Sequence, residues 1–356
     1  MKTSSELAEH FIKHAPRFHE DLDLENIDEK HIEILKASYN EVDKGTAFKK
    51  DSFRNWKAQS DMDVPAQLSV SAIKNEGLPI FILKYLYKKV FRRNEDKYLK
   101  SAFCDDMDII KGIDAEQLML DNPVHTTPGA TAAYYINDTS INLRWLRYIY
   151  ALKRILDLKI IRNNSIWVDV GSYYGGLQGL VHKYVPESKI VMVDFHHQLC
   201  RSFIYLSQLY PDALHVLPSD LKKYNSLQDI PAGSFVYVPV SNYDVIADQT
   251  VDLVTNFFSF GEMRREYFNI YHNSKLFSES KICYLVNRFV SAPFFDSTYD
   301  NDLSVLDYSS LGRETRYFDV FPMHHYLLLK RNVFGRSEFR NMSSPYFELV
   351  TSKKTS

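Results

Sequence analysis

Short apolar runs alternate with amphipathic stretches along the middle and end of the chain. The runs are rich in β-branched and aromatic residues and cover residues 165–170, 188–195, 233–240, 252–259, 280–288 and 324–331. Helical apolar spacing lies between several of them, at 175–184, 197–209 and 263–277. Strands that alternate with helices are typical of a mostly parallel sheet covered on both faces. The pattern therefore predicts an α/β fold.

The last two apolar segments, residues 315–322 and 323–331, follow each other almost directly. This connection is too short for a helical crossover, which a parallel pair of strands would need. We therefore expect them to form an antiparallel hairpin at the edge of the sheet.

The first part of the chain has a different pattern. Residues 26–42 and 78–93 have helical apolar spacing, and no strand–turn–helix signature occurs before residue 125. We expect two regions: a mostly helical one over 1–125, which packs near the substrate mouth or forms oligomer contacts, and a second domain over 126–356.

A loop and a helix are expected at the start of the second domain. Residues 122–140 are rich in turn formers, and residues 140–159 follow with helical spacing. Ser140 or Thr139 is the expected N-cap of this helix. Its predicted buried face is formed by Ile141, Trp145, Ile149, Leu152 and Leu156.

Composition excludes several classes. The formal net charge of the 356 residues is -2, so attraction to nucleic acid is not expected. The three cysteines form no CxxC pair, which argues against a zinc or disulfide framework. The sequence shows neither an apolar signal segment nor an apolar run long enough for a transmembrane helix, so we expect a cytoplasmic protein. The 24 Tyr and 23 Phe suit either a sugar-binding cleft or an aromatic core.

A glycine-rich turn follows the first strong strand, in the stretch WVDVGSYYGG at residues 167–176. Ligands of parallel α/β sheets bind at the carboxyl ends of the strands, where this turn lies. Asp194 ends the next strand, and a carboxylate there can accept hydrogen bonds from both hydroxyls of a ribose. The turn and the acid together predict a nucleoside-binding site.

Two nucleoside ligands compete for this site. A dinucleotide requires the pattern G-x-G-x-x-G, but Tyr173 occupies the second glycine position and would crowd a pyrophosphate. S-adenosylmethionine has no phosphate and tolerates a looser turn. Asp169 also fits this ligand, because it can hold backbone N–H groups of the turn or meet the cationic methionine end. The turn thus favours S-adenosylmethionine as the cofactor.

With these residues and the terminal hairpin, the chain resembles the class I S-adenosylmethionine-dependent methyltransferases over residues 140–335. More narrowly, it resembles the sugar O-methyltransferases of bacterial polysaccharide gene clusters. The resemblance rests on the stretches VDVGSYYGGLQ, VMVDF, TNFFSFGEMRREYFNIY and CYLVNR. It implies a Rossmann-like seven-stranded sheet with a terminal antiparallel hairpin. Tyr173 departs from the family, whose turn usually carries a glycine there.

The resemblance implies an enzyme that transfers a methyl group to a sugar hydroxyl of a surface glycan or its precursor. The residues expected to bind S-adenosylmethionine are Asp169, Gly171, Ser172, Tyr173, Tyr174, Gly175, Gly176, Asp194, Phe195, Ser241 and Asn256. The residues expected to bind the substrate are Ser259, Asn287 and Arg288. His196 and His197 are expected to flank the adenosine.

Removal of the hydroxyl proton requires a base. Glu262 follows the fourth strand and is our first candidate, although it could also simply stabilise the N-terminus of a helix. His325 and then His324 are the alternatives, and only one of the two can face the cleft because neighbours on a strand point to opposite faces. The carboxylates show no clear metal-ligand spacing, so no metal is expected.

Two other functions remain open: a catalytically inactive module that binds the cofactor, and an NAD-dependent sugar oxidoreductase. We expect a sugar or glycan acceptor as partner and no nucleic acid. The sequence leaves homo-oligomer formation open.

Overall fold

The computed structural model describes residues 4–14, 93–123, 134–136, 139–141, 143–291, 303–309, 312–323, 329–331, 337–339 and 345–354. The chain divides into two compact units. One consists of residues 1–52, 151–321 and 344–356, and the other of residues 53–150 and 322–343. The division expected near residue 125, and the role expected for residues 1–125, stay predictions.

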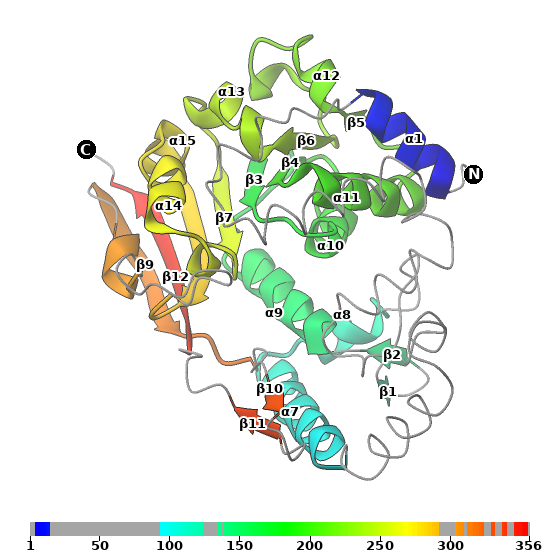
Figure 1. The fold of residues 1–356 in the computed structure, drawn as a ribbon, viewed down its shortest axis with the longest axis vertical. Helices are drawn as coiled ribbons and strands as arrows, with labels where there is room; N and C mark the ends of the chain where they lie inside the picture. The colour runs from blue at the N-terminus through cyan, green and yellow to red at the C-terminus, as the bar shows by residue number, and fades with distance from the viewer. Residues whose placement is uncertain are drawn as a thin grey trace. The chain divides into compact units, whose positions relative to one another are not determined.

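The first unit is built on an eight-stranded sheet (Figure 1). Its strands are β3 (Ile166–Val170), β4 (Lys189–Asp194), β5 (His215–Val216), β6 (Phe235–Pro239), β7 (Leu253–Phe257), β8 (Ile282–Arg288), β9 (Arg313–Val320) and β12 (Tyr346–Lys353). Their order is β5-β6-β4-β3-β7-β8-β12-β9. The strands from β5 to β8 pair in parallel, and β12 is antiparallel to both β8 and β9.

This arrangement confirms the predicted Rossmann-like fold with an antiparallel end. The sheet has eight strands instead of seven because the two-residue strand β5 adds to the edge beside β6. Every residue of β3, β4 and β6 is buried, as expected for parallel strands that are covered on both faces.

Helices cover both faces of the sheet. The helices of this unit are α1 (Ser4–His14), α10 (Gly176–Tyr184), α11 (His196–Leu209), α12 (Pro218–Leu221), α13 (Asp244–Ala247), α14 (Arg265–His272) and α15 (Lys275–Glu279). Val168 and Val170 of β3 share a buried cluster with Phe268 of α14 and Phe277 of α15. Asp169 lies between them in β3 and hydrogen-bonds to α10. Because neighbours on a strand point to opposite faces, α10 and α14–α15 cover different faces (Figure 1).

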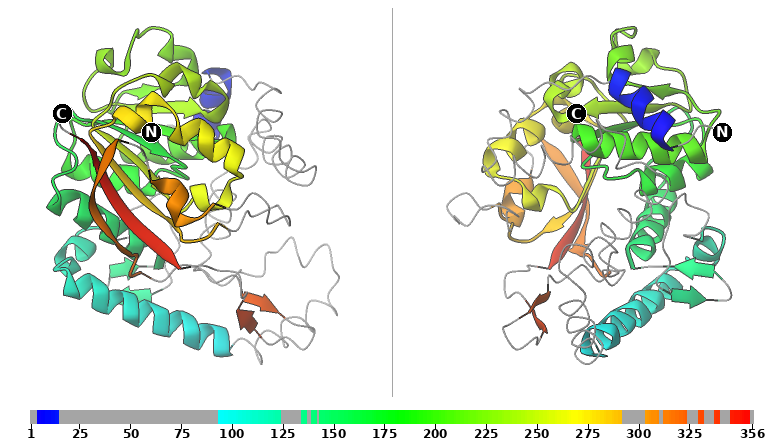
Figure 2. Two further views of the ribbon diagram at one scale, coloured as in Figure 1. Left: turned by 90° about the vertical axis from the view of Figure 1, so that its left-hand side faces the viewer. Right: turned by 45° about the vertical axis from the view of Figure 1, so that its right-hand side comes forward.

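The predicted partner in the terminal hairpin was wrong. β9 contains most of the expected segment 315–322, but it pairs with β12 at Tyr346–Lys353 (Figure 2). Residues 324–328 lie outside the described part of the chain. Leu329–Arg331 forms β10, which pairs with β11 (Ser337–Phe339) in a separate two-stranded sheet within the second unit.

The sequence pattern did not predict β12, because a charged residue lies in the middle of this strand. Glu348, in the middle of β12, is fully buried. Its Oε1 accepts hydrogen bonds from the Tyr284 hydroxyl at 2.6 Å and from Arg154 Nε at 3.2 Å. This charged position interrupts the apolar run that a core strand usually shows, and only the long-range partners satisfy it.

The predicted helix at 263–277 is divided into α14 and α15. Ser274 stands between them, and its hydroxyl accepts a hydrogen bond from Phe277 N at 3.4 Å as the N-cap of α15. A capping serine starts a new helix at this position instead of continuing the first one.

The second unit contains α7 (Arg93–Gly112), α8 (Glu116–Leu120) and a small hairpin, in which β1 (Tyr134–Ile136) pairs with β2 (Thr139–Ile141). The division between the units falls within α9 (Leu143–Asp157). The predicted cap of α9 was wrong, because Thr139 and Ser140 lie in β2. The helix predicted at 26–42 lies outside the described residues, as does the one at 78–93 except for Arg93.

Candidate functional site

The glycine turn joins β3 to α10 at the carboxyl edge of the sheet, as the sequence predicts. Gly171 and Gly175 have φ values of 81° and 84°, in the left-handed region. A Cβ atom at Gly171 would lie 2.2 Å from Ser259 Oγ, so only glycine fits here. Tyr173 also has a positive φ, of 56°, a conformation that costs energy for a residue with a side chain.

Asp194, at the end of β4, holds this turn in place. Its Oδ2 accepts a hydrogen bond from Tyr173 N at 2.7 Å, and its Oδ1 accepts one from Phe195 N at 2.7 Å. The side chain lies at the bottom of the turn, and burial raises the pKa of its carboxyl to about 7 although both backbone hydrogen bonds oppose this. Each oxygen keeps a second lone pair for another donor.

Asp169 lies deeper, inside the layer between the sheet and α10. Its Oδ1 accepts a hydrogen bond from Thr255 Oγ1 at 2.5 Å, and its Oδ2 accepts one from Gln178 Nε2. Burial raises the pKa of this carboxyl to about 8. The structure thus places Asp169 among protein partners, and its contact with a cofactor stays a prediction. Sequence reasoning missed Gln178, whose only signal is its place in the helix after the turn.

The other residues of the turn are mostly buried. The Tyr174 ring lies against Tyr173 and Tyr205, with ring centroids 5.1 and 5.2 Å away. The Ser172 hydroxyl is buried and has no hydrogen-bond partner within the described residues. It is therefore a polar group in the turn that lacks a protein acceptor or donor.

Asn256, Ser259 and Asn287 form one buried network that ties the ends of β3, β7 and β8 together. Asn256 Nδ2 donates to Val170 O at 2.7 Å and to Ser259 Oγ at 2.5 Å. Asn287 Nδ2 donates to Asn256 Oδ1 at 3.0 Å, and Asn287 Oδ1 accepts from Gly261 N at 3.1 Å. Asn256 and Asn287 are fully buried. The network positions the strand ends, while direct ligand contacts by its members stay predictions.

Glu262 and Arg288 lie together at the same edge of the sheet. Glu262 ends η4 (Phe260–Glu262), and Arg288 ends β8. Glu262 Oε1 lies 3.6 Å from Arg288 Nη2, and the side chains are 41% and 11% exposed, respectively. Arg288 Nε donates to the Tyr346 hydroxyl at 3.0 Å. Tyr346, which the sequence did not single out, starts the strand β12 that the pattern missed.

The remaining predicted positions lie at the β4 and β6 ends of the same edge. Phe195 is the N-cap residue of α11, and His196 begins that helix and packs against Phe11 of α1 at 5.2 Å. Ser241 lies in η3 (Val240–Asn242), directly after β6, and its hydroxyl donates to Asn242 Oδ1 at 3.2 Å. The catalytic candidates His324 and His325 lie outside the described residues.

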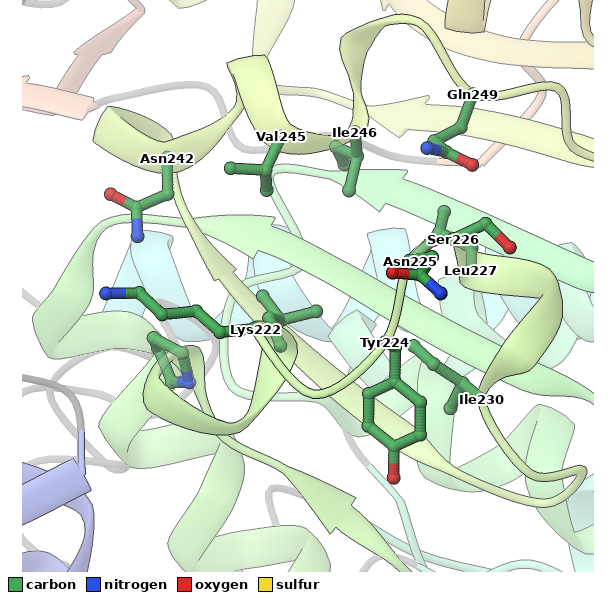
Figure 3. A pocket seen from close by; sticks show the side chains of 12 residues that line it. Lys222, Tyr224, Asn225, Ser226, Leu227, Ile230, Asn242, Val245, Ile246 and Gln249 are labelled. Carbon is green, nitrogen blue, oxygen red and sulfur yellow. The ribbon is translucent and has the colours of Figure 1, made fainter.

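Asn242 also lines a separate hollow of about 230 Å³ beside β6 (Figure 3). Its other lining residues are Pro218, Leu221, Lys222, Tyr224, Asn225, Ser226, Leu227, Ile230, Val245, Ile246 and Gln249. None of the residues of the glycine turn lines this hollow. In the described ranges, no group of three or more His, Cys, Asp or Glu residues could hold a metal ion, and no helix is long and apolar enough to cross a membrane.

Comparisons with known proteins show likeness in fold only. No family model and no curated protein matches the chain. Among solved structures, it is similar to the small RNA methyltransferase HEN1, at 14% identity and a TM-score of 0.37 over 64% of this chain and 27% of that one. It is similar to MtNAS in complex with MTA, at 14% identity and a TM-score of 0.34 over 59% and 61% of the two chains.

A third similar structure is the methyltransferase domain of a bacterial Hen1 protein, at 13% identity and a TM-score of 0.33. That match covers 59% of this chain and 97% of the other. The chain therefore spans less than two thirds of the first two proteins and nearly all of the third.

Proposed function

We propose that this protein is an S-adenosylmethionine-dependent O-methyltransferase that acts on a sugar hydroxyl of a surface glycan or its precursor in the cytoplasm. The observation that carries the proposal is the turn at residues 171–176, closed onto the carboxylate of Asp194 at the end of the next strand. A carboxylate at this position suits the two hydroxyls of a ribose.

The residues present fit this cofactor. Gly171 lets the backbone of the turn approach Ser259 closely, and the Ser172 hydroxyl is a buried polar group without a partner among the described residues. Asp194 would hold the ribose, and Phe195 and Ser241 would flank the adenosine. When bound, S-adenosylmethionine supplies a methyl group on a sulfonium, which is activated for transfer to a nucleophile.

The chain itself would orient the acceptor and remove its proton. Glu262, with 41% of its side chain exposed, is the carboxylate at this edge that solvent can reach beside Arg288. As a general base, it would take the proton of the attacking hydroxyl while the oxygen gains the methyl group. The buried network of Asn256 and Asn287 would hold the ends of β7 and β8 in fixed positions beside the cofactor and the acceptor.

Binding and turnover test this proposal. Calorimetry with S-adenosylmethionine and with NAD should show affinity for the first alone, and labelled methyl groups should then reach acidic or neutral sugars in an acceptor screen. Asp194→Ala should weaken cofactor binding by at least about tenfold, because two ribose hydrogen bonds to a charged group are lost. Affinity for NAD alone would contradict the proposal. Cofactor binding without turnover on any glycan would point to the inactive module instead.

A further inference from the structure

The guanidinium of Arg288 lies at the proposed acceptor side of the site, and its two Nη nitrogens, called the fork below, lack hydrogen-bond partners among the described residues. Its Nε donates to the Tyr346 hydroxyl, and its Cζ lies 5.6 Å from the centre of the Tyr346 ring. These contacts fix the plane of the guanidinium. Among the described residues, no hydrogen bond engages either Nη nitrogen, since the 3.6 Å approach of Glu262 is an ion pair beyond hydrogen-bond distance. The fork is therefore oriented but incompletely paired.

The surroundings of this fork are aromatic and strained. Phe258, directly after β7, has a φ of 71°, a left-handed conformation that is strained for a residue other than glycine. Its ring lies 5.2 Å from Tyr346 and 5.5 Å from Phe321, centroid to centroid. Phe258 thus packs in a strained conformation against the Tyr346 ring, which also contacts Arg288.

A second polar group near the fork also lacks a partner. The Tyr308 hydroxyl is buried, and within the described part of the chain it has no hydrogen-bond partner. Burial raises the pKa of this hydroxyl well above its usual value, and the positive charge of Arg288 is close enough to oppose that rise. A largely buried guanidinium and a buried hydroxyl without a partner among the described residues both favour an acceptor.

We propose that Arg288 binds an acidic group of the acceptor, a carboxylate or a phosphate carried by the sugar. This inference rests on the proposed methyltransferase function. An oxyanion accepts two parallel N–H···O bonds from a guanidinium, a geometry that neither a neutral hydroxyl nor the present approach of Glu262 provides. The acidic group replaces Glu262 as the partner of Arg288, so the charge of the half-buried guanidinium stays balanced.

This exchange links recognition to the chemistry. Without acceptor, the Glu262 carboxylate is paired with Arg288. Once the acidic group binds both Nη nitrogens of Arg288, Glu262 loses this ion pair and accepts the proton of the attacking hydroxyl. A neutral sugar leaves the pair intact and is a poorer acceptor. Glu262 and the acidic group thus compete for Arg288. Removal of the Glu262 charge should therefore strengthen binding of the acidic sugar, and a binding experiment measures this direction.

The test measures binding of matched sugars to the full chain saturated with S-adenosylhomocysteine. The pairs are a hexuronic acid against its hexose and a hexose 6-phosphate against the same hexose. We expect the wild type to bind one acidic member at least about tenfold more tightly than the neutral one, as for hydrogen bonds to a charged group. The better acidic member distinguishes a carboxylate from a phosphate.

Variants of Arg288 and Glu262 test whether Arg288 binds the acidic group. Arg288→Gln should abolish the preference for the acidic sugar, and Arg288→Lys should keep part of it, because a lysine offers charge without the fork. Glu262→Gln should tighten binding of the acidic sugar, because its competitor for Arg288 is gone. Arg162→Gln, at an exposed arginine before β3, should change neither and serves as the matched control.

Three results would overturn the inference: no acidic preference in the wild type, equal weakening of both sugars by Arg288→Gln, or weaker acid binding by Glu262→Gln. Equal weakening of the binding of both sugars would mean that Arg288 only positions Tyr346 and stabilises the pairing of β12 with β8. Affinity for S-adenosylhomocysteine is measured on the same samples. If it is intact, only the inference fails, whereas a wild type that does not bind it refutes the proposed function as well.

Discussion

Replacement of Gly171 by alanine separates backbone strain from crowding at the glycine turn. The backbone of Gly171 has a φ of 81°, and a Cβ atom there would lie 2.2 Å from Ser259 Oγ and 2.7 Å from Ser259 Cβ. The left-handed conformation costs an alanine about 1–2 kcal/mol. Overpacking against a buried side chain adds about 1–3 kcal/mol. Gly171→Ala should therefore lower the free energy of unfolding by about 2–5 kcal/mol.

Gly312 provides the matched control. Its φ is 86°, but a Cβ atom there would meet no atom within 4 Å in the described part of the chain, apart from its own chain neighbours. Gly312→Ala should therefore cost only the strain, about 1–2 kcal/mol. The difference between the two variants, about 1–3 kcal/mol, measures the contact with Ser259. Urea denaturation at equilibrium gives both free energies on the full chain.

A double variant tests the cause of that difference. In Gly171→Ala combined with Ser259→Gly, the next neighbour of the new Cβ atom is Asn256 Nδ2 at 3.6 Å, an ordinary contact. The double variant should thus be more stable than the sum of the two single effects by about 1–3 kcal/mol. Cofactor affinity should fall in Gly171→Ala and recover partly with Ser259→Gly. Equal destabilisation by Gly171→Ala and Gly312→Ala would refute this account of the turn.

Three further changes probe the same site. Asp169→Asn should make the free energy of unfolding less dependent on pH. Burial raises the pKa of Asp169 from 3.8 to about 8, so the wild type should lose stability as the pH rises from 4 to 8, by up to about 1.4 kcal/mol per pH unit. Denaturation of both proteins at pH 5 and pH 8 measures this difference. Glu262→Gln should lower turnover about 10²-fold or more with unchanged cofactor affinity, whereas near-normal turnover would shift the candidate base to His325 and then His324. Tyr173→Gly should raise the melting temperature slightly by relieving the positive φ of 56°, which a lower value would contradict.

The parallel half of the sheet was predictable from the sequence. The strands β3, β4, β6, β7 and β8 lie within two residues of their predicted bounds. Burial on both faces requires near-continuous apolar runs, and such runs are visible without knowledge of the partners. The position of the glycine turn beside Asp194 follows from the same logic, because the carboxyl ends of parallel strands meet at one edge.

Features that depend on distant residues were not predictable. Glu348 in β12 is satisfied by Arg154 and Tyr284, which lie 194 and 64 positions away in the chain. No local sequence pattern predicts partners that lie so far away in the chain. The positive φ of Phe258 likewise has no sequence signal, because a phenylalanine rarely adopts it without its surroundings.

The direction of β12 explains how Tyr346 reaches the edge of the sheet where Arg288 lies. In a purely parallel sheet, the first residue of a strand lies at the edge opposite to the ligands. β12 runs antiparallel to β8, so its first residue, Tyr346, pairs with Arg288, the last residue of β8. The strand that buries Glu348 in the core thus also delivers the hydroxyl that orients Arg288. A register shift of one residue in β12 would move the side chains of Glu348 and Tyr346 to the opposite face, so core packing and the orientation of Arg288 depend on the same pairing.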